Sequence, residues 1–378
     1  MLLIENGELF APQSRGRNAV LVAGARIEAI GAIDGTALAK SGVELETLDA
    51  NGCIVAPGLV DPHVHLIGGS GEEGFATMTP EVQLSELLLA GITTVVGTLG
   101  TDTTTRTMPA LLAKVKGLRE EGLNAFAWTG GYDARALTGS IRDDVVLLDE
   151  VIGAGELAIA DRRGAHFTAN ELAKLASDCY VAGTLTGKAG LLHLHVGDAP
   201  RRLAILRELL AEHEVEASWL YPTHVERNEG LMSEAVELTR RGMTVDVDVV
   251  ERDLAKWVKF MRDQKGDLAM LTASSDAAIN SPHTLLDEVR ACVHERAASL
   301  EEALALVTGN TARVLKLRDA GTIAAGNRAD ILVLERESLA LRHVICNGEI
   351  VVRDGSLTRR ERFLHKSNRE IVLRGAKR

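Results

Sequence analysis

Two patterns of hydrophobic and polar residues alternate along the chain, most regularly over residues 56–316. Short apolar runs of strand length are separated there by longer stretches in which apolar residues recur every three or four positions, as on one face of a helix. The predicted strands lie at 54–66, 93–99, 125–129, 157–160, 191–196, 219–225, 244–249 and 268–273. The predicted helices between them lie at 79–90, 108–121, 170–182, 201–213 and 230–241.

Eight strands with intervening helices predict an α/β fold, a parallel (β/α)8 barrel of the TIM type. An open doubly wound sheet shows the same alternation and is the main alternative. A barrel takes roughly 250 residues, so a chain of 378 residues has room for a second, smaller domain.

The two ends of the chain have a β pattern instead. Residues 1–55 predict strands at 20–22, 26–30 and 44–48 with no helix between them. Strands are also predicted at 329–334 and 344–352, the second interrupted by Asn347-Gly348, a strong hairpin turn signal. Neither end can bury a sheet face alone, so we expect both to form one small β-sandwich. The predicted domains are 1–55 and 317–378, with a C-terminal tail, around a barrel at 56–316.

Composition narrows the possible partners. The net charge of −11 argues against a nucleic-acid partner. No apolar run approaches the roughly 18 residues of a membrane span, and the N-terminus lacks the basic and apolar regions of a leader peptide. The four cysteines are scattered without a C-x-x-C pair, which fits a reducing compartment. We expect a cytoplasmic homo-oligomer with a small-molecule substrate.

Candidate chemistry begins with His63 and His65, which end the first predicted barrel strand. Side chains two positions apart on a strand point the same way, so the two imidazoles can share a metal ion. Asp61 has the same parity and is either a further ligand or a group that orients a histidine. The alternative is that these histidines are hydrogen-bonded core residues.

Further polar residues stand at the ends of other predicted strands, where barrel enzymes carry their catalytic groups. They are Glu156 on strand four, His195 on strand five, His224 on strand six and Asp276 on strand eight. Four histidines and two carboxylates at one mouth suit two divalent ions with a bridging hydroxide. His193 lies one step deeper than His195, so we expect it to be packed or to support a ligand.

These residues resemble the amidohydrolase superfamily, which has an H-x-H after strand one and an aspartate after strand eight. The segments 56–61 and 321–330 are also typical of its small β domain. Within the superfamily, residues 65–72, 100–102, 129–132 and 222–228 resemble the isoaspartyl (β-aspartyl) dipeptidase family. The likeness covers essentially the whole chain.

The resemblance implies roles for individual residues and two divalent metal ions, with Zn²⁺ as the expected metal. The implied metal ligands are His63, His65, Glu156, His195, His224 and Asp276. Asp276 would also act as base and acid, and Tyr132 would polarise the scissile carbonyl. The implied substrate contacts are Glu72 for the free α-amino group, Arg163 and Arg227 for carboxylates, and Thr101 and Ser281 as lesser contacts.

Glu156 departs from the family, which bridges its metals with a carbamylated lysine at this position. A glutamate offers the same two oxygens and single negative charge, and it needs no carbon dioxide. We therefore expect Glu156 to reach both metals, one through each oxygen. The alternative is that Glu156 faces the helices.

The sequence thus predicts a binuclear zinc hydrolase that cleaves the isopeptide bond of β-aspartyl dipeptides by a metal-bridged hydroxide. Two alternatives stay open. One is another amidohydrolase acting on a cyclic amide or an N-acyl amino acid. The other is a metal-free, non-catalytic homologue, against which the retained ligand residues argue.

Overall fold

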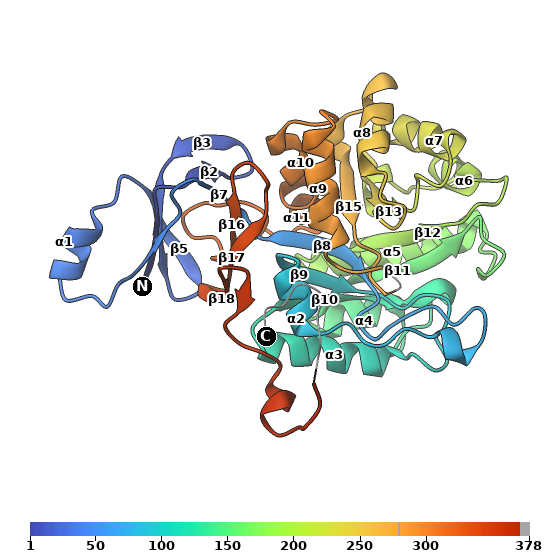
Figure 1. The fold of residues 1–378 in the computed structure, drawn as a ribbon. Coiled ribbons are helices and arrows are strands. Elements are labelled where there is room, and N and C mark those ends of the chain that lie inside the picture. The colour runs from blue at the N-terminus through green and yellow to red at the C-terminus, as the bar shows by residue number, and fades with distance from the viewer. Residues whose placement is uncertain (279, 371–378) are drawn as a thin grey trace.

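The computed structural model describes residues 1–278 and 280–370 and shows a large barrel beside a small β domain (Figure 1). The barrel strands are β8 (Leu59–Val64), β9 (Ile92–Gly97), β10 (Asn124–Gly130), β11 (Val151–Ile159), β12 (Leu191–Val196), β13 (Leu220–Thr223), β14 (Val245–Asp248) and β15 (Leu271–Ser274). Strands β8 to β13 form one parallel sheet, and β14 pairs with β15 in parallel. Because β13 packs against β14 and β15 packs against β8, the eight strands close into a ring. The prediction of a barrel is confirmed, and the open sheet is excluded.

Helices cover the outside of the ring and bury their apolar faces against the strands in one continuous core. They are α2 (Leu84–Leu89), α3 (Met108–Glu120), α4 (Ile141–Leu147), α5 (Ala169–Thr186), α6 (Ala204–Glu212), α7 (Glu229–Thr239), α8 (Leu254–Asp263), α9 (Thr284–His294), α10 (Leu300–Leu306) and α11 (Gly309–Val314). Capping residues in the sequence define where several of these helices begin. Thr168 and Glu171, for example, form a reciprocal capping box at the start of α5.

Strand β11 begins six residues earlier than predicted, at Val151 rather than residue 157. Gly153 and Gly155 concealed this part of the strand, because glycine is a poor strand residue. Here both glycines are needed for close packing. A side chain on Gly153 would come within 2.6 Å of Trp128, and one on Gly155 within 2.6 Å of His193.

The small β domain joins both ends of the chain in two sheets (Figure 1). One sheet has the order β5-β4-β1-β6 and the other β19-β18-β17-β16-β7-β2-β3. The strands are β1 (Leu2–Glu5), β2 (Glu8–Phe10), β3 (Ser14–Arg17), β4 (Ala19–Ala23), β5 (Arg26–Gly31), β6 (Glu46–Asp49), β7 (Cys53–Pro57), β16 (Ile331–Glu335), β17 (Leu341–Cys346), β18 (Glu349–Arg353) and β19 (Ser356–Leu357). Their inner faces share one apolar core, which confirms the predicted sandwich.

Two local predictions in this domain had opposite outcomes. The hairpin is confirmed, since β17 and β18 pair in antiparallel and both Asn347 and Gly348 have positive φ. The expectation of no helix within residues 1–55 is wrong, because α1 (Gly35–Lys40) lies between β5 and β6. Asp34 caps this short, exposed helix by accepting the backbone N–H of Ala37.

The small domain leads directly into the first barrel strand. Only Gly58 separates β7 from β8, and a side chain there would lie 2.1 Å from the hydroxyl oxygen of Thr93. The strand predicted over 54–66 is therefore two strands in different sheets, with β7 crossing the predicted boundary at residue 55. The domain boundaries stay predictions.

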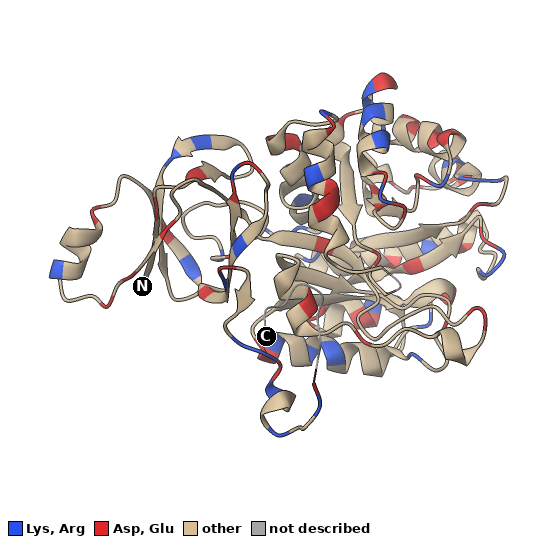
Figure 2. Cartoon of the chain, in the orientation of Figure 1, with Lys and Arg blue, Asp and Glu red and all other residues tan. Residues whose placement is uncertain are grey.

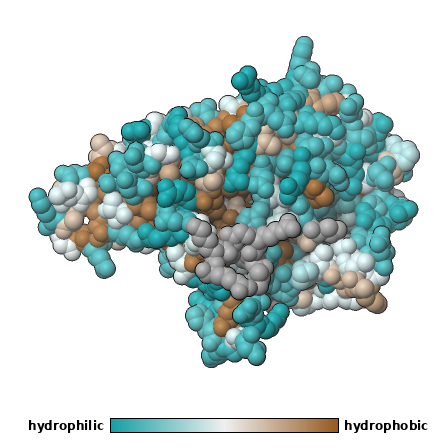
Figure 3. All heavy atoms as spheres, in the orientation of Figure 1, coloured by the Kyte–Doolittle hydropathy of each residue, from teal (hydrophilic) through white to brown (hydrophobic). Residues whose placement is uncertain are grey.

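The surface is mixed in character. Figure 2 shows acidic and basic residues interspersed over the barrel and the small domain. On the face drawn in Figure 3, hydrophilic residues predominate and apolar residues form small separate groups. Within the described residues, no helix combines the length and the apolar composition of a membrane span.

Candidate metal centre

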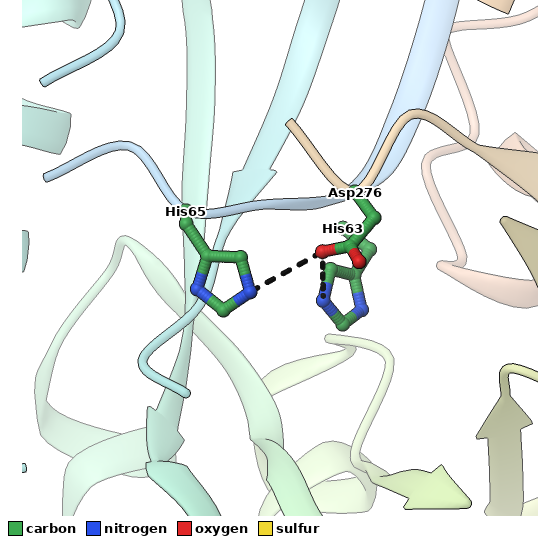
Figure 4. A group of neighbouring side chains, drawn as sticks. All are labelled: His63, His65 and Asp276. Carbon is green, nitrogen blue, oxygen red and sulfur yellow. Dashed lines mark ion pairs between the residues drawn. The ribbon is translucent and has the colours of Figure 1, made fainter. Parts of the chain in front are cut away.

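His63 and His65 project from the end of β8 toward the carboxylate of Asp276 (Figure 4). Each Nε2 atom lies 3.3 Å from Oδ1 of Asp276, which follows β15 on the adjacent side of the ring. The closed barrel thus brings together residues more than 200 positions apart in the sequence. Burial alone would lower the pKa of His63, but attraction to Glu156 and Asp276 raises it well above its usual value.

Glu156 lies between two pairs of histidines. Its Oε1 atom is 3.5 Å from Nε2 of both His63 and His65. Its Oε2 atom is 3.1 Å from Nδ1 of His195 and 3.5 Å from Nε2 of His224. The carboxylate therefore faces the barrel interior and presents one oxygen to each pair. Its role as a bridge stays a prediction.

The ring nitrogens of His195 and His224 that point away from Glu156 each meet a further carboxylate. Nε2 of His195 is 3.1 Å from Asp161, and Nδ1 of His224 is 2.7 Å from Asp248. Such carboxylates fix the tautomer and the orientation of a ligating imidazole. The hydrogen bonds from His195 and Arg163 hold the pKa of Asp161 well below its usual range.

The donor set fits divalent metal ions. Three groups of nitrogen and oxygen atoms among the described residues lie close enough to hold an ion: His63–His65–Asp276, His63–Glu156–His224 and His224–Asp248–Asp276. Nε2 of His63 is buried without a hydrogen-bond partner in the described chain. A buried nitrogen that faces two carboxylates and makes no hydrogen bond is well placed to receive a cation.

Asp61 was considered either as a further metal ligand or as a group that orients a histidine ring. The structure shows a different contact. Its Oδ1 atom accepts the backbone N–H groups of His63 and Ser275, so it ties β8 to the segment that carries Asp276. Burial raises the pKa of Asp61 to about 7. The structure places this carboxylate beneath the histidines, as a backbone anchor.

Tyr132 lies over the second histidine pair. Its hydroxyl is 2.9 Å from Nδ1 of His195, and the side chain is buried. Burial and the nearby Glu156 raise the pKa of Tyr132 well above its usual value. The phenol therefore keeps its proton and can donate a hydrogen bond into the cavity.

A cavity of about 220 Å³ opens above these residues. The residues in and beneath it fall into three groups, which differ in exposure. We call His63, Glu156, His195 and His224 the floor of the centre, because their side chains are at most 4% exposed. We call Glu72, Thr101, Arg163 and Arg227 the rim; all four line the cavity. His65, Tyr132 and Asp276 lie between them and line it too.

The rim is held together by ion pairs. Nη1 of Arg163 is 3.1 Å from Glu72, and its other face donates to Asp161 at 3.0 Å from Nε and 2.7 Å from Nη2. Thr101 is 3.5 Å from Glu72, and Nε of Arg227 donates to the carbonyl of Val196. Acidic and basic groups thus face one another across the opening.

One predicted substrate contact falls outside this arrangement. Ser281 lies in the turn before α9, where its carbonyl accepts the backbone N–H of Thr284, and it is not among the described residues that line the cavity. The structure gives its predicted contact no support.

Several polar residues of the site were not among the predicted site residues. Asp161, Asp248 and Arg106 belong to this group. A signal existed for Asp248, because the alternation Val245-Asp246-Val247-Asp248 places two aspartates on one face of β14. Arg106 lines the cavity and donates to the carbonyl of Thr79, and its position in a loop gave no comparable signal.

Comparison with known proteins places this geometry in context. A model of the amidohydrolase family matches residues 54–351. A crystal structure of a β-aspartyl dipeptidase from Fervidobacterium islandicum is 36% identical, with a TM-score of 0.90 over 95% of this chain and 98% of that chain. A second structure of the F. islandicum enzyme, in complex with β-Asp-Leu dipeptide, is 35% identical, with a TM-score of 0.87 over 94% of this chain and 97% of that chain.

The curated proteins that this chain resembles include adenine deaminases. An adenine deaminase of Methanothrix thermoacetophila is 32% identical over 127 residues, which cover 33% of this chain and 22% of that protein. Adenine deaminase 2 of Rhizobium etli is 28% identical over 335 residues, which cover 83% of this chain and 51% of that protein. The chain thus spans at most about half the length of these two relatives.

Proposed function

Since the chain belongs to the amidohydrolase family, we propose that it is a binuclear zinc hydrolase that cleaves the isopeptide bond of β-aspartyl dipeptides. The observation that carries the proposal is the charge pattern of the rim. A β-aspartyl dipeptide has one free ammonium group and two carboxylates, and the rim offers one carboxylate, Glu72, and two guanidinium groups, Arg163 and Arg227. Arginine forks match carboxylates in shape as well as in charge.

The floor, together with His65 and Asp276, would hold the metal ions. His63, His65 and Asp276 would bind one ion, His195 and His224 the other, and Glu156 would contact both. When bound, two such ions polarise the scissile carbonyl and supply a water of lowered pKa as the nucleophile. Imidazole nitrogen and carboxylate oxygen are both common zinc ligands, which supports zinc over magnesium or calcium.

Two side chains would handle proton and charge at the scissile bond. The hydroxyl of Tyr132 would donate to the carbonyl oxygen as negative charge develops there, in the manner of an oxyanion hole. A carboxylate oxygen of Asp276 would accept a proton from the attacking water and return it to the leaving amine. Its position, 22% exposed beside the cavity, leaves it accessible to both partners.

Rim residues would select the substrate. Glu72 would pair with the free α-amino group, while Arg163 and Arg227 would bind the two carboxylates and Thr101 would add a hydrogen bond. An N-acylated amino acid or a cyclic amide lacks the ammonium group that Glu72 would bind. Adenine is a neutral planar ring, so it leaves all three charges of the rim unmatched. The rim therefore supports the dipeptidase over these rivals.

A substrate panel tests the proposal. The zinc-loaded protein should hydrolyse β-Asp-Leu, and it should act far more slowly on α-Asp-Leu, dihydroorotate, an N-acetyl amino acid and adenine. Hydrolysis is followed by release of free leucine or by the absorbance of the ring compounds. Turnover of adenine with no turnover of β-Asp-Leu would overturn the proposal in favour of a deaminase.

A further inference from the structure

A buried histidine behind the metal centre connects one of the predicted ligands to a backbone carbonyl. Nδ1 of His63 lies 2.8 Å from Nε2 of His193, and Nδ1 of His193 lies 2.9 Å from the carbonyl oxygen of Tyr221. Both imidazoles are fully buried. On its opposite side the His63 ring presents Nε2 to Glu156 and Asp276.

The carbonyl determines the direction of every hydrogen bond in this chain of groups. A carbonyl oxygen can only accept, so Nδ1 of His193 must carry a proton. The opposite arrangement would place two lone pairs 2.9 Å apart in an interior that water cannot reach. A neutral imidazole has only one N–H, which leaves Nε2 of His193 as an acceptor. Nδ1 of His63 must then be the donor, and Nε2 of His63 keeps its lone pair.

We propose that His193 is a positioning residue that sets the tautomer of His63, so that Nε2 of His63 is the nitrogen offered to a metal ion. The inference rests on the metal centre of the proposed function. It assigns a role to a histidine that touches neither the substrate cavity nor an ion. The role differs from that of Asp248, which faces His224 with a negative charge, because His193 orients its partner without adding charge.

The surroundings of His193 make the arrangement rigid. Its ring stacks on Trp128, with centroids 5.0 Å apart and planes 26° apart, and the Trp128 indole N–H donates to the carbonyl of Pro62. Tyr221 is held at its other end, where its hydroxyl meets Thr272 at 2.6 Å. His193 is fully buried, and its two ring nitrogens face Nδ1 of His63 and the carbonyl of Tyr221, with no carboxylate of the described chain bonded to either. A buried charge without a partner of opposite sign is costly, so the ring is neutral.

Zinc titration of the full-length chain tests the proposal. His193→Phe keeps a flat ring against Trp128 but removes the acceptor, and it should weaken one of the two zinc affinities by roughly 10–100-fold, as loss of a supporting partner of a ligand usually does. His193→Gln supplies an acceptor oxygen and should recover most of that loss. Trp128→Phe is the matched control, since it changes the packing on the same ring and leaves both hydrogen bonds in place. It should leave both zinc affinities close to those of the parent.

Nitrogen NMR of ring-labelled histidines gives a readout that does not depend on activity or on how well a variant folds. In the zinc-loaded parent, His193 should be protonated at Nδ1 and bare at Nε2, with a scalar coupling across the hydrogen bond to Nδ1 of His63. A proton on Nε2 of His193, or parental zinc affinities in His193→Phe, would overturn the inference. Failure of the parent to hydrolyse β-Asp-Leu while it binds zinc would count against the proposed function alone.

Discussion

The floor and the rim of the metal centre are built from the same kinds of charged groups in opposite surroundings. On the floor, the side chains of His63 and Glu156 are 0% and 1% exposed and lie 3.5 Å from each other. On the rim, Arg163 and Glu72 are 33% and 41% exposed and pair across the mouth of the cavity. Water can stabilise the rim charges, whereas only neighbouring groups or a cation can stabilise those of the floor.

This difference in exposure suits the floor to metal binding and the rim to substrate binding. A buried carboxylate among histidines is costly unless it is paired, so the floor residues depend on one another and on any ion they bind. A partly exposed ion pair is weak, so the rim can exchange its own partners for the charges of a substrate. We therefore expect substitutions on the floor to change metal content, and substitutions on the rim to change substrate affinity at constant metal content.

The largest effect is expected for Glu156→Gln, which keeps the shape of the side chain and removes its charge. The variant should lose at least one ion per chain, measured by elemental analysis. Loss of an ion that supplies several kcal/mol of stabilisation should lower kcat on β-Asp-Leu by on the order of 10³-fold or more. Reconstitution of the metal-free parent should not depend on bicarbonate. Full occupancy of both ions in the variant would remove Glu156 from the metal centre.

Tyr132→Phe tests whether every buried residue of the centre affects metal binding. Tyr132 is buried like the floor residues, yet its hydroxyl faces the cavity beside His195. Loss of one donor to the developing oxyanion should lower kcat by roughly 10²–10³-fold. KM and metal content should stay near those of the parent. A loss of zinc from this variant would instead make Tyr132 a support for His195.

Sequence reasoning reached the floor because that part of the site depends on local rules. Alternation along β8 and β12 places His63, His65 and His195 on inward faces, and parallel strands present their carboxyl ends at one mouth of the barrel. The resemblance to the family, and not alternation, placed Glu156 at the metal centre. The start of the strand that carries Glu156 was missed. Gly153 and Gly155 are required there by close contacts with residues of adjacent strands, and these contacts cannot be read from the local sequence.

His193 was expected to be packed or to support a ligand, but the sequence did not indicate which ligand. The contacts of His193 with His63, and of Asp161 with Arg163 and His195, depend on distances between strands that the sequence does not encode locally. The role of Ser281 was carried over from the family; among the described residues Ser281 does not line the cavity, and its contact stays a prediction. Alternation along a strand can therefore indicate which face a side chain occupies, and the three-dimensional fold is needed to identify its partner.

Glu72→Gln is the matched counterpart of Glu156→Gln on the rim, with the same chemical change in a more exposed place. Losing a charge-assisted contact with the substrate's ammonium group should cost about 1.5–3 kcal/mol, or roughly 10–150-fold in kcat/KM on β-Asp-Leu. Metal content should not change. N-acetyl-β-Asp-Leu should be a poor substrate of the parent, and the variant should discriminate less between the two dipeptides. Equal rates on both dipeptides in the parent would favour an N-acyl amino-acid hydrolase.

The smallest effect concerns Arg163, a rim residue that also contacts the buried carboxylate of Asp161. One end of its guanidinium makes two hydrogen bonds to Asp161, whose side chain is 5% exposed, and the other end meets Glu72, which is 41% exposed. A double-mutant cycle isolates the interaction between two side chains from their other contacts. We expect the Glu72–Arg163 cycle, made with Glu72→Gln and Arg163→Gln, to give a coupling of about 0.2–1 kcal/mol in the free energy of unfolding, decreasing with added salt.

The Asp161–Arg163 cycle, made with Asp161→Asn and the same Arg163→Gln variant, should give a larger coupling that is less sensitive to salt. Its carboxylate is buried, and it accepts two guanidinium hydrogen bonds with a shape that matches them. Both cycles should be measured by urea unfolding of the metal-free protein, so that release of an ion does not contribute to the free energy. Equal couplings would mean that burial of the Asp161 carboxylate does not strengthen its pairing with Arg163. A larger coupling to Asp161 would mean that the buried carboxylate holds the guanidinium in place, while Glu72 remains free to exchange it for the ammonium group of a substrate.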